Sequence, residues 1–240
     1  FTMSAFYMPI GAISWLSLAR QYDRARAALL RGDHSLMLAF YNTRLGRSYR
    51  NSESTTTAKQ LRDRAEAYAP RVLPDAALVV TMAVDTQPNR LEGQIEAWGP
   101  DLEHWVIDYF TLIGSPSDPP EKPGSVWQRL DEIRRTPLLH TSGRPIMISA
   151  YGIDAGGANT QDVYNYGSAR KAFNCTVLHG ATRPNRPIMG SAPSRVDIDW
   201  GGTKTPGGVE LWQVGTDVAK DWLSSRMQLA DGAGAMHFHN

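Results

Sequence analysis

The sequence of 240 residues is poor in cysteine, in long apolar runs and in excess charge of either sign. Its one cysteine, Cys175, excludes an intramolecular disulfide and a cysteine-rich zinc site, and we expect a buried, inert thiol in a reducing cytoplasm. No apolar run approaches the ~20 residues of a membrane-spanning helix, so we expect no membrane partner. The formal net charge of +1 gives no overall attraction to nucleic acid, so a polyanion would need a local basic patch.

The chain also does not begin with methionine, and we expect no signal sequence at its start. Its first residues are too polar for the apolar part of a signal peptide and carry no basic charge. Its last residues directly follow a predicted strand, so we expect a piece of a longer protein. A hydrophobic content of 42% is enough for one sizeable core plus an extension.

Residues 1–70 carry helical patterns separated by polar stretches. Apolar positions recur at helical spacing over 14–30, and a charged helical segment covers 58–68. The composition changes at Pro74, where strand patterns begin. We therefore expect a helical linker over 1–70 and a separate domain over 71–240.

The second part begins with three strand patterns in succession, which predict an antiparallel meander, and helices and strands then alternate. This order is that of a ribonuclease H-like fold, an α/β architecture with a mixed sheet flanked by helices. In that fold the first strand lies beside the fourth. The expected strands are 78–84, 91–98, 105–113, 146–153, 175–178, 209–214 and 235–238, and the expected helices are 126–135, 160–173 and 217–227.

An aspartate closes each of two apolar runs. Asp85 follows the first expected strand, and Asp154 follows the fourth and precedes two glycines. An acid at the carboxyl end of a buried strand lies at the rim where a sheet presents its chemistry. Mg²⁺ prefers hard oxygen ligands and usually takes one or two carboxylates from the protein. If the two strands are neighbours, these acids meet and suit a divalent metal.

Each motif also has a purely structural interpretation. Asp85 would cap the turn that follows it, and Asp154 would open an Asx turn. In the functional interpretation, Gln87 is a polar residue that supports the metal ligand Asp85. Gly156 then lets a substrate backbone approach closely. The pair of acids at matched strand ends favours the functional interpretation.

Other acids and histidines fit structural roles better. Glu92 could point into the same site, but by alternation it shares a face with Glu96, so we expect it on a solvated face. His237 and His239 lie on one side of the last strand and could ligate a metal. Two histidines alone near the end of a chain are more often incidental.

Residues 183–206 are rich in proline, glycine and basic residues, and we expect a long irregular loop there. Such a loop suits contact with the phosphates of a nucleic-acid backbone, and a solvated loop is an equally good interpretation. The candidate DNA-binding residues are Arg183, Arg186, Arg195 and Lys204.

Taken together, these segments resemble the terminase large subunit of lambda-like phages, over nearly the whole chain and in one order. The segment over 40–46 is similar to the one that joins that family's ATPase to its nuclease. The other matching stretches are AVDTQ at 83–87, 90–92, 96–99, 104–109, IDAGG at 153–157 with 163–164, 179–181, VGTDVAK at 214–220 and 237–238.

The resemblance implies the C-terminal nuclease domain of such a subunit. That domain is a ribonuclease H-like endonuclease, dependent on Mg²⁺ or Mn²⁺, which cuts concatemeric double-stranded DNA during genome packaging. Asp85 matches its first catalytic acid and Asp154 its second. The third acid lies in a helix beyond Phe238, so we expect weak metal binding and feeble cleavage from this piece alone.

The resemblance also implies partners and a location for the parent protein. The implied partners are double-stranded DNA, the small terminase subunit and the portal protein, in the host cytoplasm. We expect the ATPase domain to be absent from this piece, because no Gly-x-x-x-x-Gly-Lys-Ser/Thr phosphate loop is present. In the two-metal mechanism, Asp85 would bridge two ions ~4 Å apart and Asp154 would hold one of them.

Two other functions remain open. An Asp-x-Gly turn after a strand, as at 154–156, also occurs in actin-like ATPases and sugar kinases, where it meets phosphate and magnesium. A non-catalytic docking module for a portal or a small terminase subunit would need neither acid.

Overall fold

The computed structural model describes residues 4–7, 13–29, 35–46, 58–184, 186–200 and 202–239. The chain divides into two units, Phe1–Thr55 and Thr56–Asn240. The boundary expected between residues 70 and 71 lies inside the second unit. Among the helices of the described residues, none has the length and apolar character needed to cross a bilayer.

The first unit is a helical cluster. Leu18 and Ala25 of one helix pack against Met37 and Phe40 of the next, and all four are buried. Gly46 ends the cluster with a φ of 59°, a left-handed conformation that glycine adopts without strain. Its helical segments are η1 (Ala5–Tyr7), α1 (Trp15–Leu29), α2 (Ser35–Phe40) and the π-helical η2 (Tyr41–Leu45).

The second unit is built around an eight-stranded sheet. Its strands are β2 (Val79–Gln87), β3 (Arg90–Trp98), β4 (His104–Ile113), β7 (Ala150–Asp154), β8 (Cys175–Gly180), β9 (Ser194–Trp200), β10 (Thr203–Val214) and β11 (Met236–His237). The strand order is β11-β4-β3-β2-β7-β8-β10-β9. β2, β3 and β4 form an antiparallel meander, and β7, β8 and β10 extend the sheet from β2 in parallel. The mixed α/β sheet predicted from the sequence is therefore confirmed.

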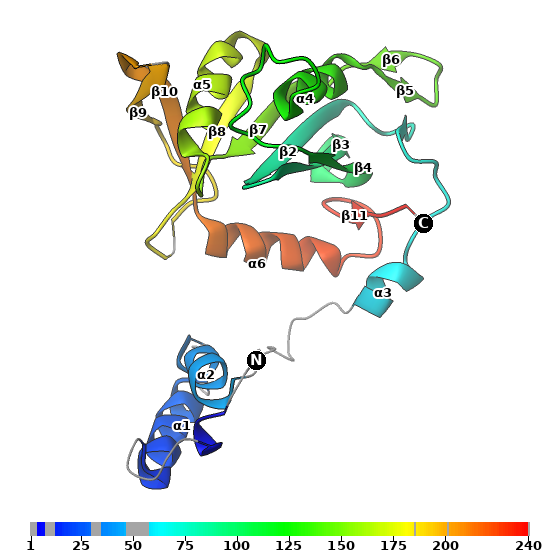
Figure 1. The fold of residues 1–240 in the computed structure, drawn as a ribbon. Helices are drawn as coiled ribbons and strands as arrows, with labels where there is room; N and C mark the ends of the chain where they lie inside the picture. The colour runs from blue at the N-terminus through cyan, green and yellow to red at the C-terminus, as the bar shows by residue number, and fades with distance from the viewer. Residues whose placement is uncertain are drawn as a thin grey trace. The chain divides into compact units, whose positions relative to one another are not determined.

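Helices lie on both sides of this sheet. α4 (Val126–Arg135) and α5 (Thr160–Ala169) cover one face, and α6 (Thr216–Met227) runs along the other side (Figure 1). The core lies under α4 and α5, where Trp127 stacks on Tyr166 with ring centroids 4.5 Å apart. Short helices α3 (Ala58–Asp63), η3 (Pro100–Leu102) and η4 (Lys171–Phe173) complete the unit.

Side chains alternate along the central strand β2. Val80, Met82 and Val84 are buried in the core beneath α4 and α5. Ala83 and Asp85 therefore point to the opposite face of the sheet. We call this second side the open face.

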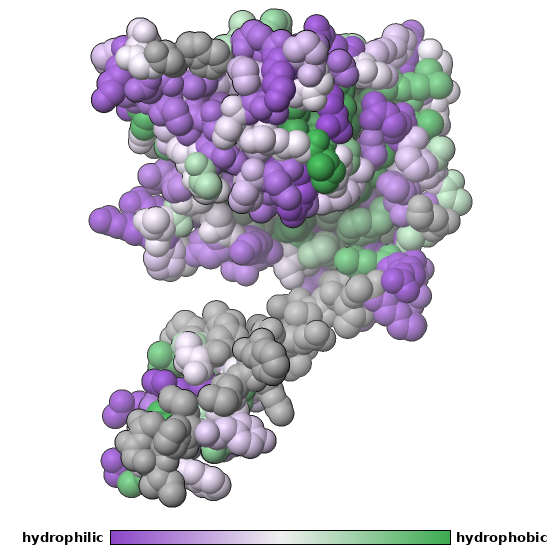
Figure 2. Space-filling model, viewed as in Figure 1, coloured by the Kyte–Doolittle hydropathy of each residue, from purple (hydrophilic) through white to green (hydrophobic). Residues whose placement is uncertain are grey.

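On the surface seen in Figure 2, hydrophilic side chains predominate and hydrophobic ones are confined to small groups.

α6 covers part of the open face. Trp222 of α6 stacks on His104 with ring centroids 6.0 Å apart, and His104 stacks on Trp98 at 4.5 Å. Trp98 Nε1 donates a hydrogen bond of 2.7 Å to Thr81 Oγ1. Thr81 is about 13 Å along β2 from Asp85, at ~3.3 Å per residue, and no described residue of α6 lines the hollow in which Asp85 lies.

A small second sheet was not predicted from the sequence. It consists of β1 (Val72–Leu73), β5 (Leu138–His140) and β6 (Pro145–Ile146). The single strand expected over 146–153 is wrong, because its first residue belongs to β6 in this small sheet and its last residues to β7 in the large one. Strands of two or three residues are too short to show a periodic pattern.

The long loop expected over 183–206 is wrong in its second half. β9 and β10 form an antiparallel hairpin there, at one edge of the large sheet (Figure 1). Val196 and Ile198 of β9 pack against the core, whereas Arg195, which precedes Val196, is exposed. This alternation is typical of a half-buried strand, although proline and glycine surround it in the sequence.

Candidate active site at the sheet rim

Asp85 and Asp154 lie at the carboxyl ends of neighbouring parallel strands. β2 and β7 pair so that Val84 stands beside Ile153, and both of these side chains are buried. The aspartates come next on each strand, so they stand side by side and point to the open face. The strands are thus neighbours, which is the condition under which the two acids meet.

Glu92 stands on the same face. The antiparallel ladder of β2 and β3 places Glu92 directly opposite Asp85. Cβ atoms of residues in this relation are about 4.5–5.5 Å apart. Glu92, Asp85 and Asp154 line one shallow hollow of about 370 Å³. The sequence favoured a solvated face for Glu92 over a place in the acid site, and the structure corrects this, because Glu92 lines the same hollow as the two aspartates.

Short-range hydrogen bonds orient both aspartates. Gln87 Nε2 donates to Asp85 Oδ2, and the main-chain N–H of Gly156 donates to Asp154 Oδ1 over 3.0 Å. A Cβ atom at Gly156 would lie 3.3 Å from both oxygens of the Asp154 carboxylate. Glycine therefore leaves room for this bond, which a larger residue would crowd. Asn159 Nδ2 donates to the main-chain oxygen of Gln87 over 3.2 Å and ties the loop after β7 to β2.

Two donors hold the Glu92 carboxylate. Arg90 Nε donates to Oε1 over 2.6 Å, and Tyr109 Oη donates to Oε2 over 2.9 Å. The hydrogen bond from Arg90, followed by that from Tyr109, lowers the pKa of Glu92. The bond to Glu92 raises the pKa of Tyr109. Glu92 is therefore a carboxylate with both oxygens engaged.

Arg90 and Tyr109 were not predicted as site residues. The period of two along β3 places Arg90 on the face of Glu92, so that signal is present in the sequence. The position of Tyr109 depends on the register between β3 and β4, which shifts between Ile95 and Glu96. A shift of this kind leaves no simple trace in the sequence pattern.

The donor set at the rim suits a hard divalent cation. Asp85 and Asp154 supply carboxylate oxygens, which Mg²⁺ and Mn²⁺ accept, and Mg²⁺ usually keeps several of its waters. Among the residues that the structure describes, no three His, Cys, Asp or Glu side chains gather closely enough to hold one ion. The fit is thus to an ion bound by two carboxylates and otherwise by water or substrate.

The four basic candidates are exposed, and the described residues that line the acid hollow include none of them. Arg183 and Arg186 lie in the segment between β8 and β9, and Lys204 lies near the start of β10. Arg195 lies on β9, opposite Glu210 of β10. The structure therefore does not gather the basic candidates around the acids.

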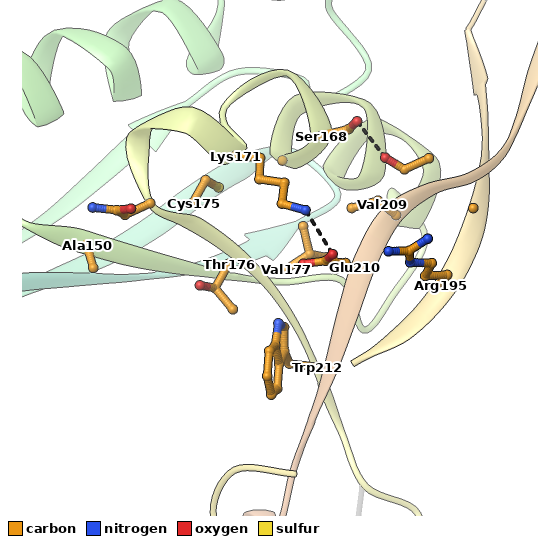
Figure 3. A pocket seen from close by; sticks show the side chains of 14 residues that line it. Ala150, Ser168, Lys171, Cys175, Thr176, Val177, Arg195, Val209, Glu210 and Trp212 are labelled. Carbon is orange, nitrogen blue, oxygen red and sulfur yellow. Dashed lines mark hydrogen bonds and ion pairs between the residues drawn. The ribbon is translucent and has the colours of Figure 1, made fainter. Parts of the chain in front are cut away.

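Arg195 lines a second, larger hollow of about 620 Å³ between α5, β8 and β10 (Figure 3). β10 pairs with β8 only from Leu211 onward, so the two strands separate before that point and leave this space. Lys171 Nζ and Glu210 Oε1 form an ion pair of 2.8 Å across it, and Trp212 lies on its wall. This hollow shares no lining residue with the acid hollow among those described.

His237 is engaged by two carboxylates. Its Nδ1 lies 2.5 Å from Glu66 Oε1 and its Nε2 lies 2.9 Å from Glu103 Oε1. The ring stacks on Trp105 with centroids 5.1 Å apart. Because both ring nitrogens already have partners, the side chain joins three segments of the chain and is not set up as a metal ligand.

Comparison with known proteins points to one family. The model of the terminase large subunit gpA endonuclease domain matches residues 1–240. The chain is 26% identical over 233 residues to the terminase large subunit of Escherichia phage lambda, a match that covers 95% of this chain and 33% of that protein. It is 27% identical over 197 residues to the terminase large subunit of Enterobacteria phage P21, covering 82% and 28%. The chain thus spans a third or less of the length of these relatives, and no solved structure matches it significantly.

Proposed function

Because the chain belongs to the family of terminase large subunit gpA endonuclease domains, we propose that it is a metal-dependent nuclease with a ribonuclease H-like fold. Its substrate would be concatemeric double-stranded DNA, cut during phage genome packaging. The observation that carries this proposal is the pairing of β2 with β7, which sets Asp85 beside Asp154 at the rim of the sheet. The central place of β2 in the strand order supports the fold assignment.

Asp85 and Asp154 are the residues that would hold Mg²⁺ or Mn²⁺. When bound, such ions activate water and stabilise the leaving oxygen of a phosphodiester. Gln87 keeps one oxygen of Asp85 in place by donating to it, and the N–H of Gly156 does the same for Asp154. These bonds fix the directions of the two carboxylates before a cation or a substrate arrives.

The proposal extends to the partners of the parent protein. The small terminase subunit and the portal protein are the expected protein partners, in the host cytoplasm. Arg183, Arg186 and Lys204 are exposed and remain candidates for contacts with DNA phosphates, with Arg195 a weaker one because it lines a separate hollow.

A plasmid-nicking assay with Mn²⁺ tests the proposal on the 240-residue chain. We expect Asp85→Asn to lower the cleavage rate by on the order of 100-fold or more, because loss of an outer partner alone costs about 10–100-fold. Asp101→Asn is the matched control. Asp101 is exposed and has a φ of 55°, a conformation that asparagine tolerates, so this variant should cleave like the wild type.

Mn²⁺ binding, followed by electron paramagnetic resonance, gives a second readout, because we expect feeble cleavage from this piece. The Asp85→Asn variant should bind Mn²⁺ more weakly than either the wild type or the Asp101→Asn variant. Cleavage and binding that are both unchanged by Asp85→Asn would remove Asp85 from the mechanism.

A further inference from the structure

We propose that Arg90 binds a backbone phosphate of the nucleic acid beside Asp85, and that Glu92 is the positioning residue that holds the Arg90 guanidinium there. The inference rests on the proposed function, because the phosphate is that of the proposed substrate. The positively charged side chain at the rim is then Arg90, which lies outside residues 183–206, the basic segment singled out from the sequence.

The register of β3 brings Arg90 to the acids. Arg90 stands opposite Gln87, which itself donates to Asp85, and Glu92 stands opposite Asp85. Alternate residues of a strand share a face, so Arg90 lies on the open face together with these side chains. A phosphate that reaches Asp85 is therefore within reach of a long arginine side chain.

The Arg90 side chain is held in place but is not saturated. Its Nε donates to Glu92 Oε1 over 2.6 Å, and its Nη1 donates to Asn89 Oδ1 over 3.1 Å. These bonds use two of the N–H groups of the guanidinium, and the rest have no partner among the described residues. The side chain is 34% exposed. Free N–H groups in a fixed fork match the paired oxygens of a phosphate.

The negative charges at the rim explain why a positively charged side chain is needed there. Asp85 and Glu92 face each other directly across the ladder, a relation in which like charges destabilise the pair and repel a polyanion. Arg90 offsets one of these charges. Both oxygens of Glu92 are engaged, by Arg90 and Tyr109, so its carboxylate orients the guanidinium. The two aspartates are left to bind a metal ion.

Binding of a short, fluorescently labelled DNA duplex to the 240-residue chain tests the inference. Fluorescence anisotropy in EDTA avoids cleavage, and the salt concentration is varied from about 50 to 200 mM. Loss of one phosphate contact lowers the slope of log K against log salt by about 1. We expect Arg90→Gln to show this change in slope and to weaken binding by about 10-fold. Arg90→Lys should keep the slope but weaken binding, because lysine lacks the fork.

Glu92→Gln separates positioning from simple charge. Removing a negative charge should strengthen binding to a polyanion, whereas loss of the partner that holds Arg90 should weaken it. We expect weaker binding, and no further loss when Arg90→Gln is combined with Glu92→Gln. Glu96→Gln is the matched control, since Glu96 lies on the same face of β3 and accepts from Gln94 over 2.6 Å. It should bind as tightly as the wild type or more tightly.

A second control tests the arginine itself. Arg71 forms an ion pair with Asp108 and has a side chain 38% exposed, close to that of Arg90, but Asp108 stands opposite the buried Ile95 and so not on the open face. Arg71→Gln should leave the slope unchanged. An unchanged slope in Arg90→Gln, or tighter binding by Glu92→Gln, overturns the inference and leaves the proposed function standing. A wild-type chain that does not bind duplex DNA overturns both.

Discussion

Among single residues, Asp131 shows how a buried carboxylate can join two helices. Its Oδ1 accepts from Tyr166 Oη over 2.9 Å, and its Oδ2 accepts from Arg170 Nη2 over 2.8 Å. Burial raises the pKa of Asp131, but the hydrogen bonds from Arg170 and Tyr166 outweigh it, so the pKa lies below its ordinary value. The carboxylate therefore stabilises the fold above the ordinary aspartate pKa, and this contribution is lost as the pH falls through the lowered value.

We expect Asp131→Asn to reduce the free energy of unfolding at pH 7 by about 2 kcal/mol, because Arg170 loses its charged partner. The difference from the wild type should shrink as the pH falls below the ordinary aspartate pKa of about 3.9. Urea denaturation at a series of pH values measures it. Asp118→Asn is the control, because the exposed pair of Asp118 and Lys122 should contribute less than about 1 kcal/mol. A loss that is the same at every pH would contradict this account.

Cys175 is buried, as expected from the sequence. Burial raises the pKa of its thiol to about 12. The thiolate is therefore scarce at neutral pH, which fits a residue that fills space in the core.

Among the elements, α5 lies against β8 at unusually short range. The contact depends on Gly167, where a Cβ atom would lie 2.2 Å from Val177 Cγ2. Both residues are buried, Gly167 in α5 and Val177, which is 2% exposed, in β8. The helix can approach the sheet this closely only without a side chain at that position.

We expect Gly167→Ala to lower the free energy of unfolding by about 1–3 kcal/mol, because the added methyl forces the helix away from β8. Adding Val177→Ala should recover part of this loss by removing the clashing methyl group. Gly190→Ala is the control, since a Cβ atom there meets its nearest neighbour at an ordinary 3.6 Å. Chemical denaturation measures these free energies of unfolding. Equal losses for Gly167→Ala and Gly190→Ala would be inconsistent with a local clash at Gly167.

Elements with a long, regular pattern were predictable from the sequence. α4 spans Val126–Arg135 as expected, and Ser125 fixes its start by accepting from the main-chain N–H of Gln128. β9 was missed, although Val196 and Ile198 alternate with polar residues, because prolines and glycines on both sides favoured a loop. The two-residue strands β1 and β6 depend on pairing partners and not on local pattern.

The candidate site was likewise predictable from the sequence only in part. Asp85 and Asp154 could be found because each ends an apolar run, and the order of strands suggested that those runs are neighbours. The alternation along β3 could have placed Arg90 beside Glu92, but the bond from Tyr109 to Glu92 could not be found, because it depends on the register between β3 and β4. Register is set by packing across the whole sheet and by the irregularity in β4, which no short segment specifies.

In the molecule as a whole, residues 64–68 are joined to the sheet and to the end of α6. The Arg64 guanidinium donates to the main-chain oxygens of Met227 and Leu229. The Glu66 N–H donates to the main-chain oxygen of Phe238 over 2.7 Å, and Tyr68 Oη donates to that of Val106 over 2.8 Å. These contacts lie within the second unit, Thr56–Asn240.

Two truncations measure where the domain begins. A chain of residues 56–240 should unfold cooperatively with a midpoint within about 2 °C of the full chain. A chain of residues 71–240 loses these hydrogen bonds, together worth about 3 kcal/mol, and should melt roughly 6–12 °C lower. Circular dichroism on heating measures both. Equal midpoints for the two truncations would mean that residues 56–70 are only a linker, as the sequence suggested.

The pairing of β11 with β4 has a consequence for biosynthesis. Met236 pairs with His104, and His237 pairs with Trp105, so β4 has to wait for a partner strand that is synthesised much later. Until those late residues leave the ribosome, the nascent chain carries a bare hydrogen-bonding edge that other chains can join. Slow synthesis of this segment therefore extends the period in which a chaperone can protect the nascent chain from association with other chains.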